Sequence, residues 1–336
     1  MSKRYVMRPG LRRARITVAL TGLLAILASQ VGAQCPIYST QWGSRGSGDG
    51  QFSYPHGVAT DPASNVYVVE HGNHRIQKFT STGVYLTQWG SPGSGVGQFL
   101  YPEAIASDAA GNVYVAETGN SRIQKFTSTG VYLTQWGSFG SGNGELDGAG
   151  GVAIDPAGDV YVADIGNHRI QKFTSTGVYL GQWGSRGSGN GEFDYPQGVA
   201  TDASGNVYVA DNWNYRIQKF TSTGVYLAQW GSFGGGDGQF NSPVGVATDA
   251  AGEVYVADVA NHRIQKFTNT GTYLCQWGSF GSGDGQFNAP FGVATNAAGD
   301  VYVADTHNHR IQKFGPAPTP ATSGRELMTI AIRAFS

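Results

Sequence analysis

The residues best suited to chemistry in this sequence are its histidines. They are His56, His71, His74, His168, His262, His307 and His309. An imidazole can move a proton near neutral pH, and its nitrogens are common ligands of zinc. A histidine directly before an arginine, as in four of these cases, can instead simply pack on a loop. Ser121 and Tyr215 stand in that place elsewhere in the chain, which favours packing over a metal site.

An acidic residue, an asparagine and an arginine recur in a fixed order, as in Asp164, Asn167 and Arg169. A carboxylate at this spacing can accept hydrogen bonds from the guanidinium and from backbone N–H groups across a tight turn. The set occurs six times, whereas a catalytic group is needed once, so we interpret it as a folding device. No G-x-S-x-G elbow or comparable setting for a nucleophile accompanies it.

A glycine-rich stretch, GSRGSGDGQF at residues 43–52, also recurs in related form. Such stretches can hold phosphate or calcium, but the lysine of a phosphate-binding P-loop is absent. Asp49 is replaced by Val96 and Asn143 in other copies, so its carboxylate is not required. We interpret these stretches as connecting loops, with a calcium site at Asp237 or Asp284 as the alternative.

The chain that must position these residues is strictly periodic. The segments RIQKF and QWGS each occur six times, at intervals of 47 residues. Each unit reads as four short strands separated by turns, for example GVATD, NVYVVE, RIQKFT and VYLTQWGS. Four antiparallel strands in a repeat of about 40 to 50 residues predict a propeller blade. The predicted fold class is therefore all-β, a six-bladed β-propeller of four-stranded antiparallel blades.

The two ends of the repeat region predict how the ring closes. The sixth unit, residues 292–314, contains three strands and lacks the fourth. Residues 37–44 supply a single fourth strand at the other end of the repeats. We expect this N-terminal strand to pair beside residues 310–314, which completes the last blade and leaves no large unpaired edge.

The segments outside the repeats predict compartment and charge. Residues 1–33 combine a basic start, an apolar run and a small-residue cleavage pattern, so we interpret them as a secretory signal peptide, with an uncleaved anchor as the alternative. Their removal leaves 16 basic and 23 acidic residues, a formal charge of −7, which disfavours nucleic acid and anionic membranes as partners. The propeller would then span residues 34–315. Residues 316–336 read as a proline-rich spacer and a short tail.

The chain contains two cysteines, Cys35 and Cys275. Export permits a disulfide bond between them, but two cysteines in a domain of this size are not a disulfide framework. Cys275 takes the place that Thr87 and Thr134 hold in their repeats. This replacement favours two unrelated small residues, and a bridge is the alternative.

The run GQFxxPxGVATDxxGxVYVADxxNxRIQKF resembles the NHL repeat, and it recurs over nearly all of residues 37–315. The resemblance implies a six-bladed propeller that binds proteins, and in some members RNA. Animal relatives often carry RING and B-box regions with zinc ligands, and this sequence has no such ligand set. Secreted bacterial NHL proteins are the nearer comparison. Basic residues outside the repeated positions are too few for an RNA-binding stripe.

Topology sorts the loops of such a ring onto two faces. The loop between the second and third strands shares a face with the loop between blades, as at residues 70–75 and 43–54 of the first copy. We call this the variable face, because its residues differ from copy to copy, whereas the opposite face carries nearly invariant TSTG turns. Variation over a fixed frame is what a binding surface needs. We expect a ligand to contact His56, His71, Glu103, Gln197, Asn212, Trp213, Tyr215, Phe291 and His307.

The function that these observations predict is binding without catalysis. We expect a secreted or periplasmic monomer that needs no cofactor and recognises a protein or peptide. Extracellular carbohydrate is a second class of ligand, because an acidic face with aromatic residues suits it as well. A metal-dependent lyase or hydrolase is the alternative activity, since five of the seven histidines belong to the first and last blades, which are neighbours in a closed ring.

Overall fold

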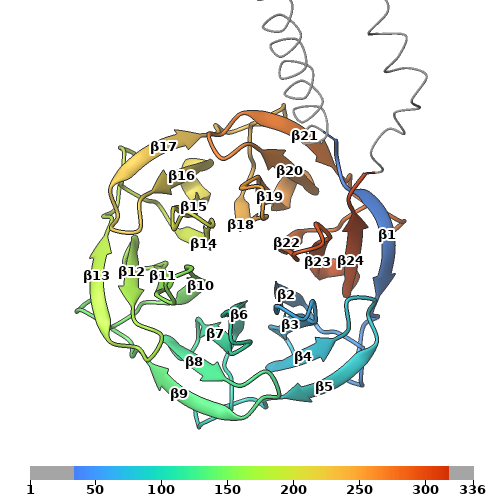
Figure 1. Cartoon of the computed structure of the whole chain (residues 1–336), viewed down its shortest axis with the longest axis horizontal. Coiled ribbons are helices and arrows are strands. Elements are labelled where there is room, and N and C mark those ends of the chain that lie inside the picture. The colour runs from blue at the N-terminus through green and yellow to red at the C-terminus, as the bar shows by residue number, and fades with distance from the viewer. Residues whose placement is uncertain (1–33, 318–336) are drawn as a thin grey trace, which may run out of the picture. The chain divides into compact units, whose positions relative to one another are not determined.

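A computed structural model describes residues 34–317, of which residues 35–316 form one compact unit. The predicted signal peptide and nearly all of the predicted spacer and tail lie outside the described residues. Six four-stranded antiparallel sheets stand around a central channel, which confirms the predicted six-bladed propeller (Figure 1). Within the described part of the chain, no helix is long and apolar enough to span a membrane.

Five blades are built from consecutive strands, which follow one another from the channel outward. Blade 1 contains β2 (Pro55–Thr60), β3 (Val66–Glu70), β4 (Arg75–Phe79) and β5 (Tyr85–Trp89). Blade 2 contains β6 (Pro102–Ser107), β7 (Val113–Glu117), β8 (Arg122–Phe126) and β9 (Tyr132–Trp136). Blade 3 contains β10 (Ala149–Ile154), β11 (Val160–Asp164), β12 (Arg169–Phe173) and β13 (Tyr179–Trp183).

Blades 4 and 5 follow the same plan. Blade 4 contains β14 (Pro196–Thr201), β15 (Val207–Asp211), β16 (Arg216–Phe220) and β17 (Tyr226–Trp230). Blade 5 contains β18 (Pro243–Thr248), β19 (Val254–Asp258), β20 (Arg263–Phe267) and β21 (Tyr273–Trp277). Blade 6 takes its strands from both ends of the described chain, as β22 (Pro290–Thr295), β23 (Val301–Asp305), β24 (Arg310–Gly315) and β1 (Ile37–Trp42). Single 3-10 turns, η1 (Asn212–Asn214), η2 (Val259–Asn261) and η3 (Thr306–Asn308), connect the middle strands of blades 4, 5 and 6.

The core lies between blades rather than within them. The two middle strands of blade 1, β3 and β4, are buried along their whole length, and their β-branched and aromatic residues suit a sheet that is covered on both sides. Tyr67 and Ile76 of blade 1 pack with Phe99 and Val113 of blade 2, and Trp89 covers this cluster from the outer strand. The same arrangement recurs at each of the other five boundaries.

The TSTG turns of the opposite face are fixed by packing between blades. Gly83 has a φ of +87°, and a Cβ at this position would lie 2.6 Å from the Trp42 indole of the neighbouring blade. Only glycine combines that conformation with that approach. Gly130 and Gly177 meet Trp89 and Trp136 in the same way. The near-invariance of this face therefore follows from packing.

The ring closes as the strand count predicts. Strand β1 pairs antiparallel with β24, with Ile37 opposite Gly315 and Trp42 opposite Ile311. The guanidinium of Arg310 donates a hydrogen bond of 2.5 Å to Oε1 of Gln41, so the side chains also join the two ends. Blade 6 is thus complete only when the first and last strands of the repeat region meet.

A disulfide bond between Cys35 and Cys275 reinforces this closure, with the two Cα atoms 5.8 Å apart. The interpretation of two unrelated small residues is therefore wrong. Cys35 lies two residues before β1 of blade 6, and Cys275 lies in β21, the outer strand of blade 5. Closure of the ring brings these neighbouring blades together, which no local sequence pattern reveals. The bond joins residues 240 positions apart and ties β1 to a second blade.

Candidate functional site

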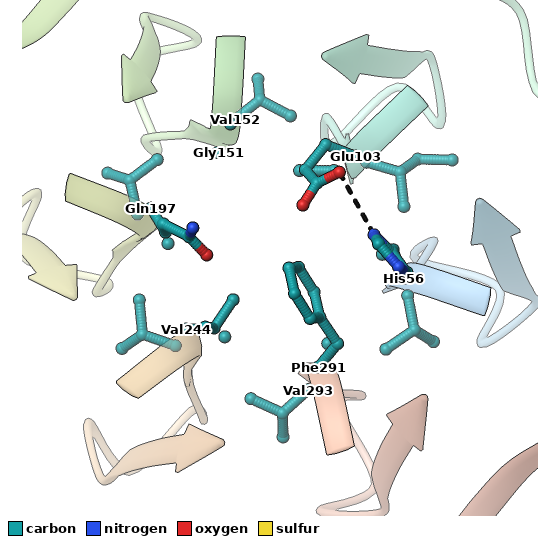
Figure 2. Close-up of a pocket in the computed structure, with 18 residues that line it drawn as sticks. His56, Glu103, Gly151, Val152, Gln197, Val244, Phe291 and Val293 are labelled. Carbon is teal, nitrogen blue, oxygen red and sulfur yellow. Dashed lines mark hydrogen bonds and ion pairs between the residues drawn. The ribbon is translucent and has the colours of Figure 1, made fainter. Parts of the chain in front are cut away.

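The mouth of the channel on the variable face is lined by the second residue of every inner strand. These residues are His56, Glu103, Gly150, Gln197, Val244 and Phe291. Figure 2 shows the Phe291 ring inside the mouth, with His56 and Glu103 on one side and Gln197 on the other. The cavity at the mouth has a volume of about 80 Å³. Sites for small organic molecules commonly measure about 300 to 1,000 Å³, so this mouth has room for an ion, waters or one inserted side chain.

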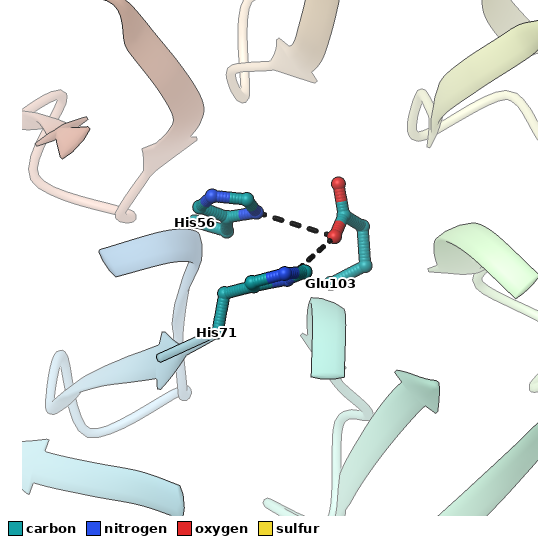
Figure 3. A group of neighbouring side chains, drawn as sticks. All are labelled: His56, His71 and Glu103. Carbon is teal, nitrogen blue, oxygen red and sulfur yellow. Dashed lines mark hydrogen bonds and ion pairs between the residues drawn. The ribbon is translucent and has the colours of Figure 1, made fainter. Parts of the chain in front are cut away.

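His56, His71 and Glu103 form a tight group beside the mouth (Figure 3). The Nδ1 atoms of both histidines lie 3.2 Å from the same oxygen, Oε2 of Glu103. The two imidazole rings stack, with 4.4 Å between their centres. Because Glu103 belongs to blade 2 and both histidines belong to blade 1, the group bridges two blades.

The carboxyl group of Glu103 remains ionised despite its burial. Burial by itself raises the pKa of this group, but the hydrogen bonds and charges of His56 and His71 outweigh that effect and lower the pKa to about 2. The side chain is only 12% exposed. Within residues 34–317 no lysine or arginine forms an ion pair with it, so the two imidazoles are its side-chain partners. A buried carboxylate depends strongly on such partners.

A stack of rings connects this group to the rim of the variable face. Phe291 lies against His56, with 4.3 Å between ring centres, and Tyr101 lies against His71 at 4.9 Å. Phe291 occupies the channel mouth, whereas Tyr101 is exposed. The stack thus forms a continuous surface from the mouth to the loop that precedes β6. Exposed ring faces of this kind provide large contact area for another molecule.

The histidines that precede the repeated arginines have a structural role. Nδ1 of His74 accepts a hydrogen bond from the backbone N–H of Tyr101 in the next blade, at 3.2 Å. His168, His262 and His309 accept the same bond from Tyr195, Ala289 and Tyr54. Burial lowers the pKa of His74 and of His309, with smaller contributions from neighbouring positive groups. These four histidines therefore join loops of adjacent blades, in agreement with the packing interpretation.

A second cluster of rings lies at blade 4. Trp213 in η1 stacks on Tyr195, with 4.0 Å between ring centres, and it is 54% exposed. Tyr215 contacts Phe233, which is also exposed. Asn212 is different, because it is buried and its amide donates to Oγ of Ser242 and to the carbonyl of Pro243. Trp213 and Tyr215 thus belong to the surface, whereas Asn212 supports the loop below it.

All exposed aromatic side chains among the described residues lie on the variable face. They are Tyr54, Tyr101, Phe139, Trp213, Phe233 and Phe280. Of these, only Trp213 was expected from the sequence. The missed residues could have been found from the variation between copies of the repeat, which identified Trp213. Phe139, for example, stands where other copies have Arg45 or Pro92.

The tyrosines at one repeated position of this face are held in a left-handed backbone conformation. Tyr54, Tyr101 and Tyr195 have φ values of +49°, +48° and +55°, at a position where blade 3 has Gly148. A bulky residue is disfavoured in this conformation, so folding alone does not explain why a tyrosine is kept there. Ser242 and Ala289 adopt the same conformation at the equivalent position of blades 5 and 6, so the turn itself imposes it whichever side chain is present.

The structure divides the expected site residues into two groups. His56, His71, Glu103, Gln197 and Phe291 gather at or beside the mouth. The buried Oε1 of Gln197 has no hydrogen-bond partner within the described residues. Trp213, Tyr215 and His307 lie farther out in the loops between the middle strands, and His307 is exposed beside Tyr54.

The histidines of the first and last blades do not converge on one point. His56 and His71 turn toward Glu103 of blade 2, whereas His307 and His309 contact Tyr54. The alternative of a metal site built from histidines at the seam of blades 1 and 6 is thus not supported, and the candidate ligand group among the described residues lies at the boundary of blades 1 and 2. Sequence order did not indicate this, because the third member comes from the next repeat.

The repeated acidic, asparagine and arginine residues form a buried network in every blade. In blade 3, Nε of Arg169 donates to Asp164 at 2.7 Å, and Asn167 donates to the same carboxylate. The guanidinium also donates to the carbonyls of Ser141, Gly142 and Glu145, which belong to the glycine-rich loop. The network thus holds the glycine-rich loop in place, as the folding interpretation expects.

A comparison with known protein families shows to which family this chain belongs. The NHL repeat matches six segments, at residues 52–79, 99–126, 146–173, 193–220, 240–267 and 287–314. The chain belongs to the NHL repeat family. The matched segments run from the end of each glycine-rich loop to the end of the third strand, so they contain the acidic residue, the asparagine and the arginine of each network. A comparison with curated protein sequences found no match.

Solved structures share the fold of this NHL propeller at low identity. A streptogramin B lyase structure is 16% identical with a TM-score of 0.60, and the match covers 82% of this chain and 96% of the other. A gluconolactonase from Xanthomonas campestris is 12% identical with a TM-score of 0.59, covering 79% and 88%. A nidogen/laminin complex gives 17% identity and a TM-score of 0.52, covering 66% and 79%. These likenesses show the fold alone, because the same architecture serves enzymes and protein complexes.

Proposed function

We propose that this NHL propeller is a non-enzymatic recognition protein that binds a protein or peptide on its variable face. The observation that carries the proposal is the one-sided distribution of exposed aromatic side chains among residues 34–317. Aromatic residues are enriched at protein interfaces and dominate their binding energy. The opposite face exposes valines instead, such as Val131 and Val178, at equivalent positions of the repeat.

The size of the channel mouth supports recognition of a chain rather than of a small substrate. A cavity of about 80 Å³ accepts one side chain of a bound segment, while the flat rings around it contact the rest. Because His56, Glu103, Gln197 and Phe291 differ in size and charge, the mouth has no sixfold symmetry. A ligand can therefore bind in a single orientation on a nearly symmetric ring.

A secreted or periplasmic location is part of the proposal. The disulfide bond between Cys35 and Cys275 supports it, because disulfide bonds form and persist in oxidising compartments. The N-terminal sequence, with its pattern of a signal peptide, supports the same location.

A metal-dependent lyase or hydrolase is the second candidate. One observation favours it: His56, His71 and Glu103 place three potential metal ligands beside the mouth. The small cavity weighs against it, because a substrate would have to react largely outside the channel.

Selection of binders from a random peptide library tests the proposed function. We expect selected peptides to compete for one site, and Trp213→Ala or Tyr101→Ala to weaken them by about 1 to 3 kcal/mol, roughly five- to 150-fold. Val131→Ser and Val178→Ser are matched controls, since these exposed apolar residues lie on the opposite face. Loss of binding only in the valine variants, or no selectable peptide, would refute the proposal.

A further inference from the structure

The group formed by His56, His71 and Glu103 satisfies the distance requirements of a shared cation. The three ligand atoms lie within 4.8 Å of one another, and both Nδ1 atoms lie 3.2 Å from Oε2 of Glu103. Two ligands bound to one zinc ion at about 2.0 to 2.2 Å lie roughly 3 to 3.5 Å apart. The nitrogen–oxygen separations therefore suit either two hydrogen bonds or one bridging ion. Only the two ring nitrogens would need to approach each other, by rotation of the side chains.

The repeat shows that the fold does not need this group. The position of Glu103 holds Gly150, Gln197 or Val244 in other blades, and the position of His71 holds Thr118 or Ile165. Those blades have the same strands and register. The contacts that build the propeller occur in every blade, as with Arg169 and its equivalents. A partly buried carboxylate with two imidazole partners that occurs only once is therefore not explained by the requirements of the repeated fold.

We propose that His56, His71 and Glu103 bind one divalent transition-metal ion of the zinc class. Two imidazole nitrogens with one carboxylate oxygen suit Zn²⁺, Co²⁺ or Fe²⁺, whereas Mg²⁺ and Ca²⁺ prefer all-oxygen sites. The ion would also place a positive charge beside the partly buried carboxylate of Glu103, which has no lysine or arginine as an ion-pair partner among the described residues.

The site is open on the side of the channel mouth. Phe291 covers one face of His56 and Tyr101 covers His71, so rings shield the ligands from the sides. Glu103 and His56 themselves line the mouth (Figures 2 and 3). Three protein ligands leave at least one coordination position, which takes water or an anionic oxygen of a bound molecule. The inference goes beyond the proposed function and does not depend on it, since an ion at this point can serve recognition or chemistry.

Calorimetric titration of untagged, metal-stripped full-length protein with Zn²⁺ tests the site, with Co²⁺ as a spectroscopic probe. We expect one ion per chain and no comparable binding of Mg²⁺ or Ca²⁺. The protein suits this experiment, because all seven histidines lie in the described residues and both cysteines are in the disulfide bond. The affinity should fall as the pH decreases, because protons compete for the imidazoles.

The variants can be taken from other blades, so that each introduces a residue that the same repeat position already holds elsewhere in the chain. Glu103→Gln copies Gln197, His71→Thr copies Thr118, and His56→Gln copies Gln197 as well. Each should lower the affinity for Zn²⁺ by about 100-fold or more, as loss of a direct ligand should exceed the 10- to 100-fold effect of a supporting residue. Zn²⁺ should raise the melting temperature of the wild-type protein and not that of Glu103→Gln.

His307→Ala is the matched control, because His307 is an exposed histidine of the same face outside the group. It should bind Zn²⁺ like the wild-type protein. The proposal is overturned if no 1:1 binding occurs, if Glu103→Gln binds as tightly as the wild-type protein, or if His307→Ala loses the same affinity. None of these measurements uses a peptide, so their failure is distinguishable from failure of the proposed function.

Discussion

Two acidic residues near the variable face, the buried Asp164 and the partly buried Glu103, have different kinds of hydrogen-bond partner. Asp164 accepts hydrogen bonds from an arginine, an asparagine and a backbone N–H, and the same pattern recurs in every blade. Glu103 lies in an inner strand, is held by two histidines, and has no equivalent in the other blades. Residues that recur in every blade are those that the fold needs. A residue that occurs in one blade only is free to take another role.

The same contrast holds for the two faces of the ring. The opposite face is nearly invariant because Gly83 and its equivalents pack under the tryptophans of neighbouring blades. The variable face is supported from below by the arginine network, so its outermost side chains can differ without loss of the fold. Substitutions of the repeated residues should therefore lower the stability of the fold, whereas substitutions of the variable surface residues should mainly change binding.

The largest effect is expected from breaking one copy of the network. Arg169→Met leaves the fully buried carboxylate of Asp164 without its cation and releases three loop carbonyls. We expect a loss of about 3 to 5 kcal/mol in the free energy of unfolding, measured by urea denaturation. Glu103→Gln should change the same quantity by less than about 1 kcal/mol. Equal losses in the two variants would remove the distinction between repeated and single groups.

Replacing the disulfide should have the next largest effect. Cys275→Thr restores the residue that Thr87 and Thr134 provide in their blades, so it leaves no misfit in β21. Loss of the link should lower the free energy of unfolding by about 2 to 5 kcal/mol. Melting curves of the wild-type protein with and without reductant should reproduce the change. An unchanged melting temperature would show that pairing of β1 with β24 is sufficient for closure.

A smaller and more selective effect is expected at Tyr101. Tyr101→Gly relieves the left-handed backbone strain, as Gly148 does in blade 3, and this gain offsets lost ring contacts. The free energy of unfolding should stay within about 1 kcal/mol, while binding of a peptide selected on the variable face weakens by about 1 to 2 kcal/mol. Strong destabilisation without loss of binding would assign Tyr101 to the frame instead.

The smallest effect concerns pH. Burial lowers the folded-state pKa of His74 and His309 below 6.5, so the unfolded chain binds more protons than the folded protein just below that pH. The free energy of unfolding should therefore fall as the pH decreases through about 6.5. Replacing both by serine, the residue that blade 2 has as Ser121, should flatten this slope in urea titrations between about pH 5 and 8. An unchanged slope would place the titrating groups elsewhere.

The number of blades and the closure of the ring could be predicted from the sequence because the blades repeat. A period of 47 residues and the missing fourth strand of the last unit were sufficient for blade number and closure. The single features were harder to predict, since each depends on contacts between repeats. The partner of His71 is Glu103 of the next blade, and the partner of Cys35 lies 240 residues away. Neither separation corresponds to a local pattern.

The closure of blade 6 also has a consequence for the order of synthesis. Strand β1 is synthesised first among the strands, whereas its partner β24 is synthesised last. Gln41 can therefore pair with Gln312 and Arg310 only after the last repeat has been synthesised. Blades 1 to 5 contain all their strands as soon as each repeat emerges, but the ring stays open until the final repeat is complete. During that interval β1 and the exposed side of blade 1 need protection from other chains. A protein built in this way gains its full stability in one late step, when the ends meet and the disulfide forms.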